Sequence, residues 1–134
     1  MSTQKVRRIN PSTMNKPFGY THVVEVVGPG RTVYIAGQTA VDGEGNVVGA
    51  GDLAAQTRQV FENLKAALGA VGADFSDVVK CNYYMTDISQ LPILREIRAN
   101  YLTGEAFPAS TAVQVGGLAR PEFMIEIEVV AVIP

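Results

Sequence analysis

The stretch MIEIEVVAV, residues 124–132, decides the fold class, because apolar and polar side chains alternate along it. Neighbouring positions on a β-strand point to opposite faces of a sheet. One face of this predicted strand is apolar and carries Ile125, Ile127, Val129 and Ala131. The other face combines two carboxylates with apolar side chains: Glu126, Glu128, Met124, Val130 and Val132. A single chain is not expected to leave such a face in water, so we expect a homo-oligomer that covers it.

The chain before this stretch favours a hairpin followed by a helix. Residues 20–27 and 32–40 are rich in β-branched and aromatic side chains, and Gly28-Pro29-Gly30 between them is a turn signal. Asp52 is a typical helix cap. The residues after it recur at helical spacing as one stripe: Leu53, Thr57, Val60, Phe61, Leu64 and Leu68. The helix is expected to end at Gly69 or Gly72.

The second half of the chain supplies the remaining elements. Residues 78–86 favour a strand with Val79, Cys81, Tyr83 and Met85 on one face. A second helix is expected to begin at Asp87 or Ser89 and to stop at Gly104. Residues 110–116 then favour a strand that pairs with residues 124–132 as a hairpin. The resulting order, β-β-α-β-α-β-β, predicts an α+β two-layer sandwich with two helices on one face of a sheet.

Composition indicates a single domain over residues 1–134, in which polar residues 1–17 form an amino-terminal arm. Hydrophobic residues make up 47% of the chain, which is enough for a core, and the formal net charge is −2. We interpret Lys5, Arg7 and Arg8 as a solvated part of the arm, so no nucleic-acid partner is expected. No apolar run is long enough to span a membrane, and no signal peptide is evident. We therefore expect a cytoplasmic protein without a membrane partner.

Motifs for metal, cofactor or nucleophilic chemistry are not found. The chain has one histidine and one cysteine, without the spacing of a zinc site, so we expect no metal and no cofactor. Cys81 is interpreted as a small core residue rather than a nucleophile. The glycine-rich stretch 43–51 lacks the Lys-Ser/Thr ending of a phosphate-binding loop and is interpreted as turns.

Four polar side chains are expected to gather beside the last strand. Glu126 and Glu128 share one of its faces, and Ser110 and Gln114 share a face of the strand before it. If the connecting loop turns near residue 120, Gln114 lies opposite Glu126. Two interpretations remain open: a solvated or salt-bridged sheet face, and a small-molecule cleft of hydrogen-bonding character.

Tyr20 and His22 are further candidates, because they stand two residues apart at the start of a predicted strand. A phenol at a strand start can point into a cleft, and packing in the core or at an interface is the alternative. His22 is the only histidine of the chain, and a structural role is its alternative.

Several short segments together carry a resemblance to a known family. They are Gly37-Gln38, QTRQ at 56–59, ENLK at 62–65, DVVK at 77–80, Thr86-Asp87, Phe107-Pro108-Ala109 and IEIE at 125–128. Their order and spacing resemble the Rid family of reactive-intermediate deaminases, also called YjgF-like or L-PSP endoribonuclease-like proteins. The resemblance implies a chorismate-mutase-like fold and a homotrimer with sites in clefts between subunits.

The resemblance also implies an activity, which is hydrolysis of imines derived from enamines such as 2-aminoacrylate. It implies that Glu126 is the catalytic carboxylate and that Tyr20 binds substrate. An arginine that clamps the substrate carboxylate in active members is replaced here by Ser110, and a family serine by Ala36. His22 is a possible substitute donor.

We therefore expect an imine or enamine deaminase whose substrate is not a simple 2-imino acid, with Tyr20, His22, Ser110 and Gln114 binding it. The first alternative is a non-catalytic module of the same fold that binds a small metabolite. The second is the ribonuclease activity that the family's other name implies, which the acidic composition disfavours.

Overall fold

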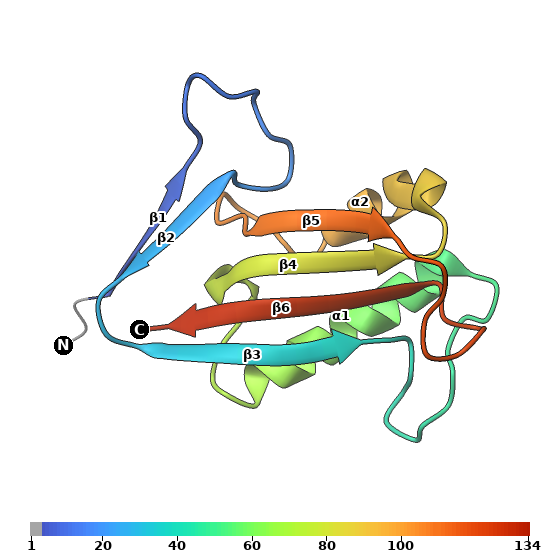
Figure 1. Ribbon diagram of the computed structural model, residues 1–134. Coiled ribbons are helices and arrows are strands. Elements are labelled where there is room, and N and C mark those ends of the chain that lie inside the picture. Colours follow the sequence, from blue (N-terminus) through green and yellow to red (C-terminus); the bar gives the residue numbers. More distant parts are fainter. Residues whose placement is uncertain (1–3) are drawn as a thin grey trace.

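The structure, a computed structural model, describes residues 4–134. Its main sheet has the strand order β3-β6-β4-β5, where β3 is Arg31–Gln38, β6 is Ile125–Ile133, β4 is Val78–Met85 and β5 is Ala109–Gln114. Helices α1 (Leu53–Gly69) and α2 (Leu91–Arg98) cover one face of this sheet, and the other face is open (Figure 1). The predicted α+β class, with two helices on one face of a sheet, is confirmed.

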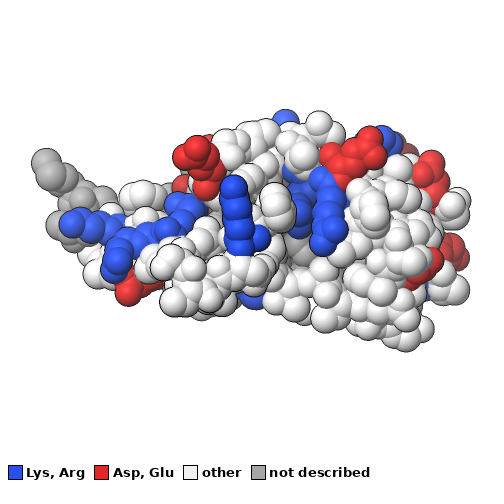
Figure 2. All heavy atoms as spheres, turned by 90° about the horizontal axis from the view of Figure 1, so that it is seen from above, with Lys and Arg blue, Asp and Glu red and all other residues white. Residues whose placement is uncertain are grey.

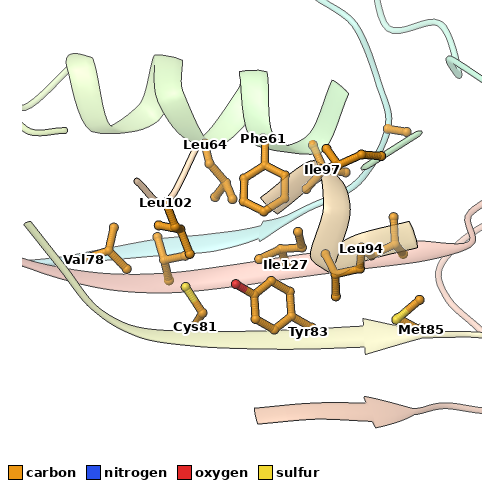
Figure 3. Packing of buried hydrophobic residues seen from close by; sticks show 14 of the residues in the cluster. Phe61, Leu64, Val78, Cys81, Tyr83, Met85, Leu94, Ile97, Leu102 and Ile127 are labelled. Atoms are coloured by element: carbon orange, nitrogen blue, oxygen red, sulfur yellow. The ribbon is translucent and has the colours of Figure 1, made fainter. Parts of the chain in front are cut away.

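The core forms where the apolar face of β6 meets the helices. Ile125, Ile127 and Ala131 have no exposed surface, and Val129 is buried as well, so the two faces expected from the alternation are confirmed. The stripe predicted on α1 is buried throughout. On β4 the core side carries Cys81, Tyr83 and Met85 (Figure 3). A register irregularity beside Lys80 places Val78 in the core instead of the expected Val79.

Helix α1 and the 3-10 turn that precedes α2 begin at side-chain caps that the sequence predicts. The Ala55 amide donates to Oδ1 of Asp52 over 3.1 Å, which satisfies one free donor at the start of α1. A short 3-10 turn, η1 (Phe75–Asp77), leads into β4. A second one, η2 (Ile88–Gln90), is capped by Asp87 and continues into α2, which ends at Arg98, before the expected Gly104.

The expected hairpin between residues 110–116 and 124–132 is wrong. β5 pairs in parallel with β4, and β4 separates it from β6. The physical reason is the connection through α2. A helical crossover carries the chain back to the end of the sheet where β4 begins, so β5 runs in the same direction as β4. Gln114 therefore lies level with Met85 instead of Glu126, whose partner on β4 is Tyr84.

The expected hairpin around residues 28–30 is also wrong. β2 (Val23–Val27) pairs with β1 (Lys5–Ile9) in a separate two-stranded sheet, while β3 pairs with β6. Part of the expected arm is thus a strand, and residues 1–3 of that arm lie outside the described residues. An isolated antiparallel bridge joins Val41 and Val47 in the glycine-rich loop before α1.

A buried glutamine fixes the loop that leads into β6. Gln56 on α1 is fully buried, and its Nε2 donates to the carbonyl oxygens of Gly49 and Glu122 over 3.1 and 2.7 Å. Its Oε1 accepts from the Met124 amide over 2.9 Å. These bonds hold the start of β6, and hence Glu126, at a fixed distance from the first helix.

Among residues 4–134, no helix combines the length and the apolar character needed to cross a membrane.

Candidate functional site

Glu126 lies on the open face of the sheet, directly over the backbone of Gly37. A Cβ built on Gly37 would be 2.0 Å from Oε2 of Glu126, so no other residue fits there without moving the carboxylate. The register between β3 and β6 shifts between Ile35 and Gln38, and Gly37 lies within this irregularity. Such irregularities commonly redirect a side chain next to a site. The side chain of Glu126 is half-buried and makes no hydrogen bond or ion pair with another described residue.

The second carboxylate of the strand has a different environment. Oε1 of Glu128 accepts from Nδ2 of Asn82 over 3.0 Å and from the hydroxyl of Tyr84 over 2.5 Å. The bond to Glu128 raises the pKa of the Tyr84 phenol, because both the accepted proton and the nearby negative charge favour the neutral phenol. Glu128 is therefore held in a network, whereas the oxygens of Glu126 remain available.

The neighbouring part of the open face forms a shallow cavity of about 360 Å³. Its lining includes Lys80, Asn82, Glu128 and the exposed ring of Tyr34. Nζ of Lys80 donates to Oγ1 of Thr111 over 3.0 Å. Asn82 and Tyr84 were not among the predicted site residues, although their alternation along residues 78–86 already places them on the face opposite Cys81.

Tyr20 and His22 lie together beyond the β5 edge of the main sheet. Their rings meet edge to face with centroids 5.4 Å apart. Nε2 of His22 is 2.7 Å from the carbonyl oxygen of Asn15, a geometry in which the ring nitrogen donates. Thr21 between them is tied to the Phe107-Pro108 segment, since its amide donates to Pro108 and its hydroxyl to Phe107. Tyr20 and His22 are thereby placed next to the segment that leads to Ser110.

Ser110 and Gln114 do not join Glu126 within one chain. Ser110 lies level with Cys81, and Gln114 with Met85, so both belong to the helix side of the sheet. Oγ of Ser110 donates to the carbonyl of Pro108 over 3.3 Å. Oε1 of Gln114 accepts from the Ile88 amide over 3.0 Å. The predicted cluster of Ser110, Gln114, Glu126 and Glu128 is wrong for a single chain, because it rested on the β5–β6 hairpin.

Cys81 is a core residue, as predicted. Burial raises the pKa of its thiol to about 11, so the thiolate that a nucleophile requires is disfavoured. Burial also raises the pKa of the adjacent Tyr83 phenol. Within residues 4–134, no group of three or more His, Cys, Asp and Glu side chains could hold a metal ion.

Residues 13–133 match the protein family described as Endoribonuclease L-PSP. The chain belongs to this family. The match spans the strands, helices and loops that position Glu126, Tyr20 and Ser110, and it agrees with the resemblance drawn from the short segments.

Solved structures and characterised relatives extend this L-PSP assignment. A protein of the conserved Rid family from Yersinia pestis, described as of unknown function, is 41% identical with a TM-score of 0.88, over 96% of this chain and 98% of the other. A RidA protein from a Psychrobacter species is 36% identical with a TM-score of 0.71, over 95% and 99%. The human 2-iminobutanoate/2-iminopropanoate deaminase is 34% identical over 127 residues, which are 95% of this chain and 90% of the human protein.

Proposed function

We propose that the protein is a hydrolytic deaminase of reactive imine or enamine metabolites. The observation that carries this proposal is the free carboxylate of Glu126, which lies over Gly37, while Oε1 of its neighbour Glu128 accepts two hydrogen bonds. The membership of the L-PSP family and the similarity to a human imine deaminase support the same chemistry.

The reaction needs one group that can move a proton. Water adds to the carbon of the C=N bond, and Glu126 takes the proton that the water loses. The same carboxyl then returns this proton to the nitrogen, which gives a carbinolamine. The proton of its new hydroxyl group next moves through Glu126 to the nitrogen, the C–N bond breaks, and ammonia leaves as the carbonyl forms. One imine and one water thus give one carbonyl compound and one ammonia.

The substrate is proposed to differ from a simple 2-imino acid. Ser110 stands where the resemblance places a substrate-clamping arginine, and its hydroxyl is already bonded to Pro108. A neutral hydroxyl lacks the charge-assisted, bidentate bonding of a guanidinium to a carboxylate. Tyr20 and His22 beside Ser110 are the proposed binding residues. Gln114 is no longer part of the proposed site, because its oxygen caps η2 on the helix side.

A homotrimer is part of the proposal. Within one chain, Tyr20 and His22 lie beyond the β5 edge while Glu126 lies on the open face, so the proposed site needs groups from two copies. The open face carries Tyr34, exposed to 79%, and Val113, exposed to 40%, which packing against further copies would cover.

The decisive test compares Glu126→Gln with Glu128→Gln. Imines are generated in situ from several amino acids by an amino-acid oxidase, and semicarbazide trapping competes with their hydrolysis. We expect Glu126→Gln to lower turnover by about 100-fold, the scale of general acid–base catalysis. Glu128→Gln is the matched control, because both of its hydrogen bonds end on Oε1, which the amide oxygen reproduces. Wild-type turnover in Glu126→Gln contradicts the proposed role.

The alternative function is a module that binds a small metabolite without turning it over. The two departures at Ala36 and Ser110 favour it, since both remove polar groups that the resemblance assigns to the site. A wild-type protein that binds 2-oxo acids in calorimetry, yet accelerates no imine in the panel, supports the module over the enzyme.

A further inference from the structure

A cavity of about 540 Å³ lies between the 15–20 segment and the end of α2. Three cationic residues, Lys16, Arg95 and Arg98, line it together with apolar and aromatic ones, while no Asp or Glu does so. Figure 2 shows the molecule from above, with several Lys and Arg side chains along its middle and Asp and Glu side chains mostly towards the upper edge and the right, one acidic group directly beside the central basic ones. The volume is typical of a small-molecule site.

Arg98 is the most constrained of the three cations. It is half-buried and forms no ion pair with an acidic residue in the described part of the chain. Its Cζ lies 5.7 Å from the centroid of the Tyr83 ring. A Cβ on Gly19 would be 2.5 Å from its Nη2, so the 15–20 segment passes directly over the guanidinium, and the φ of +74° at Gly19 favours glycine there. The guanidinium is therefore packed between β4 and the 15–20 segment.

The positive charge of Arg98 in this position favours the binding of an anion. Cations are favoured in the last turn of a helix, which is where Arg95 and Arg98 stand, but the helix end carries only a partial negative charge. A partly buried charge without a counter-ion is unfavourable. Glu105 lines an adjoining cavity together with Arg8 and does not line this one.

The other walls of the cavity suit an apolar body. Phe18, Tyr20 and Phe107 contribute aromatic rings to the lining. Phe18 is exposed to 79%, so its ring is accessible to a ligand. A ligand with a carboxylate at one end and an apolar group at the other would meet Arg98 and these rings together.

We propose that this cavity binds a small carboxylate with an apolar or aromatic body, and that Arg98 holds the carboxylate. The guanidinium fork donates two parallel hydrogen bonds, and Lys16 and Arg95 add charge at the rim. This inference concerns binding alone and stands whether or not the proposed deaminase activity is found.

The probe is 3-phenylpropanoate, titrated into the wild-type protein by isothermal calorimetry beside its neutral amide, 3-phenylpropanamide. The two share the apolar body and differ in the charge that Arg98 would bind. We expect the acid to bind about tenfold or more tightly than the amide, as a charge-assisted contact implies. Equal affinities, or no detectable binding of the acid at millimolar concentration, overturn the proposal.

Three variants locate the binding at Arg98. Arg98→Gln should lower the affinity for the acid to the affinity for the amide. Arg98→Lys keeps the positive charge but loses the two parallel donors of the guanidinium, so it should retain part of the difference in affinity between acid and amide. Arg120→Gln is the matched control, because the Arg120 guanidinium also lies 5.7 Å from an aromatic centroid, that of Phe123, and does not line the cavity. Circular dichroism melting checks that each variant is folded. Unchanged affinity in folded Arg98→Gln, or an equal loss in Arg120→Gln, overturns the assignment to Arg98.

Discussion

The carboxylate of Glu126 occupies the space that a side chain on Gly37 would need, with Oε2 at 2.0 Å from the position of a Cβ there. The two residues come from neighbouring strands, β6 and β3, and the missing side chain of Gly37 leaves room for the carboxylate in this position. Glycine at position 37 is therefore favoured by the placement of the Glu126 side chain. The backbone of Gly37 does not itself call for glycine, because its φ is not positive.

Gly37→Ala should consequently behave like a change to Glu126. The methyl group displaces the carboxylate, so we expect the loss of imine hydrolysis to approach that of Glu126→Gln, measured in the same trapping assay. Adding Glu126→Asp to Gly37→Ala withdraws the carboxylate by one methylene and should restore part of the rate. Gly43→Ala is the control, since a Cβ on Gly43 meets nothing within 4 Å. Full activity in Gly37→Ala contradicts this relationship.

Ser110→Arg should raise turnover of simple 2-imino acids such as 2-iminopropanoate. The serine is half-buried at the start of β5, and a longer side chain there is expected to cost on the order of 1–3 kcal/mol in packing. Steady-state rates and thermal melting of the variant measure both effects. A folded variant that binds 2-oxo acids and shows no turnover favours the binding module instead.

Tyr84 should titrate at lower pH once Glu128 is neutral. The negative charge and the accepted hydrogen bond both stabilise the protonated phenol, and they raise its pKa. Glu128→Gln removes the charge, so the pKa should fall towards the ordinary value for tyrosine. Carbon-13 tyrosine NMR over a pH series follows the change, with Tyr84→Phe identifying the signal. An unchanged pKa contradicts the assigned cause.

Light scattering at micromolar concentration should give the mass of three copies of the 14.3-kDa chain. Tyr34→Glu places a charge on the open face and should reduce the mass to that of a monomer. Phe18→Glu serves as the comparison, because Phe18 is also exposed to 79% and lies off the sheet. A monomeric wild type, or dissociation caused only by Phe18→Glu, argues against an interface on the open face.

Alternation along the chain was sufficient to predict the two faces of β6 and the buried stripe of α1. These patterns are local, because each side chain is sorted by its own strand or helix. Strand pairing is not local, and both hairpins were wrong for this reason. The sequence did contain a usable signal for β5, since a strand, a helix and a further strand in succession favour a parallel crossover unit.

The site was predicted less well than the fold. Glu126 was found from its place in an apolar strand, while its contact with Gly37 depends on a register irregularity between β3 and β6 that no spacing in the sequence reveals. Gln114 was misplaced because its supposed neighbour followed from the incorrect hairpin. Lys5–Ile9 was expected to be part of an arm because residues 1–17 are polar and carry Pro11 and Pro17, yet it pairs along its whole length with β2.

The central position of β6 has a consequence for biosynthesis. It is the last strand in chain order, yet it bonds to β3 on one side and β4 on the other. During translation the chain emerges from the amino-terminal end. The edges of β3 and β4 that pair with β6 therefore remain without a partner until residues 125–133 have left the ribosome. Release of these residues, more than any earlier step, should set the moment at which the nascent domain becomes resistant to proteolysis and aggregation.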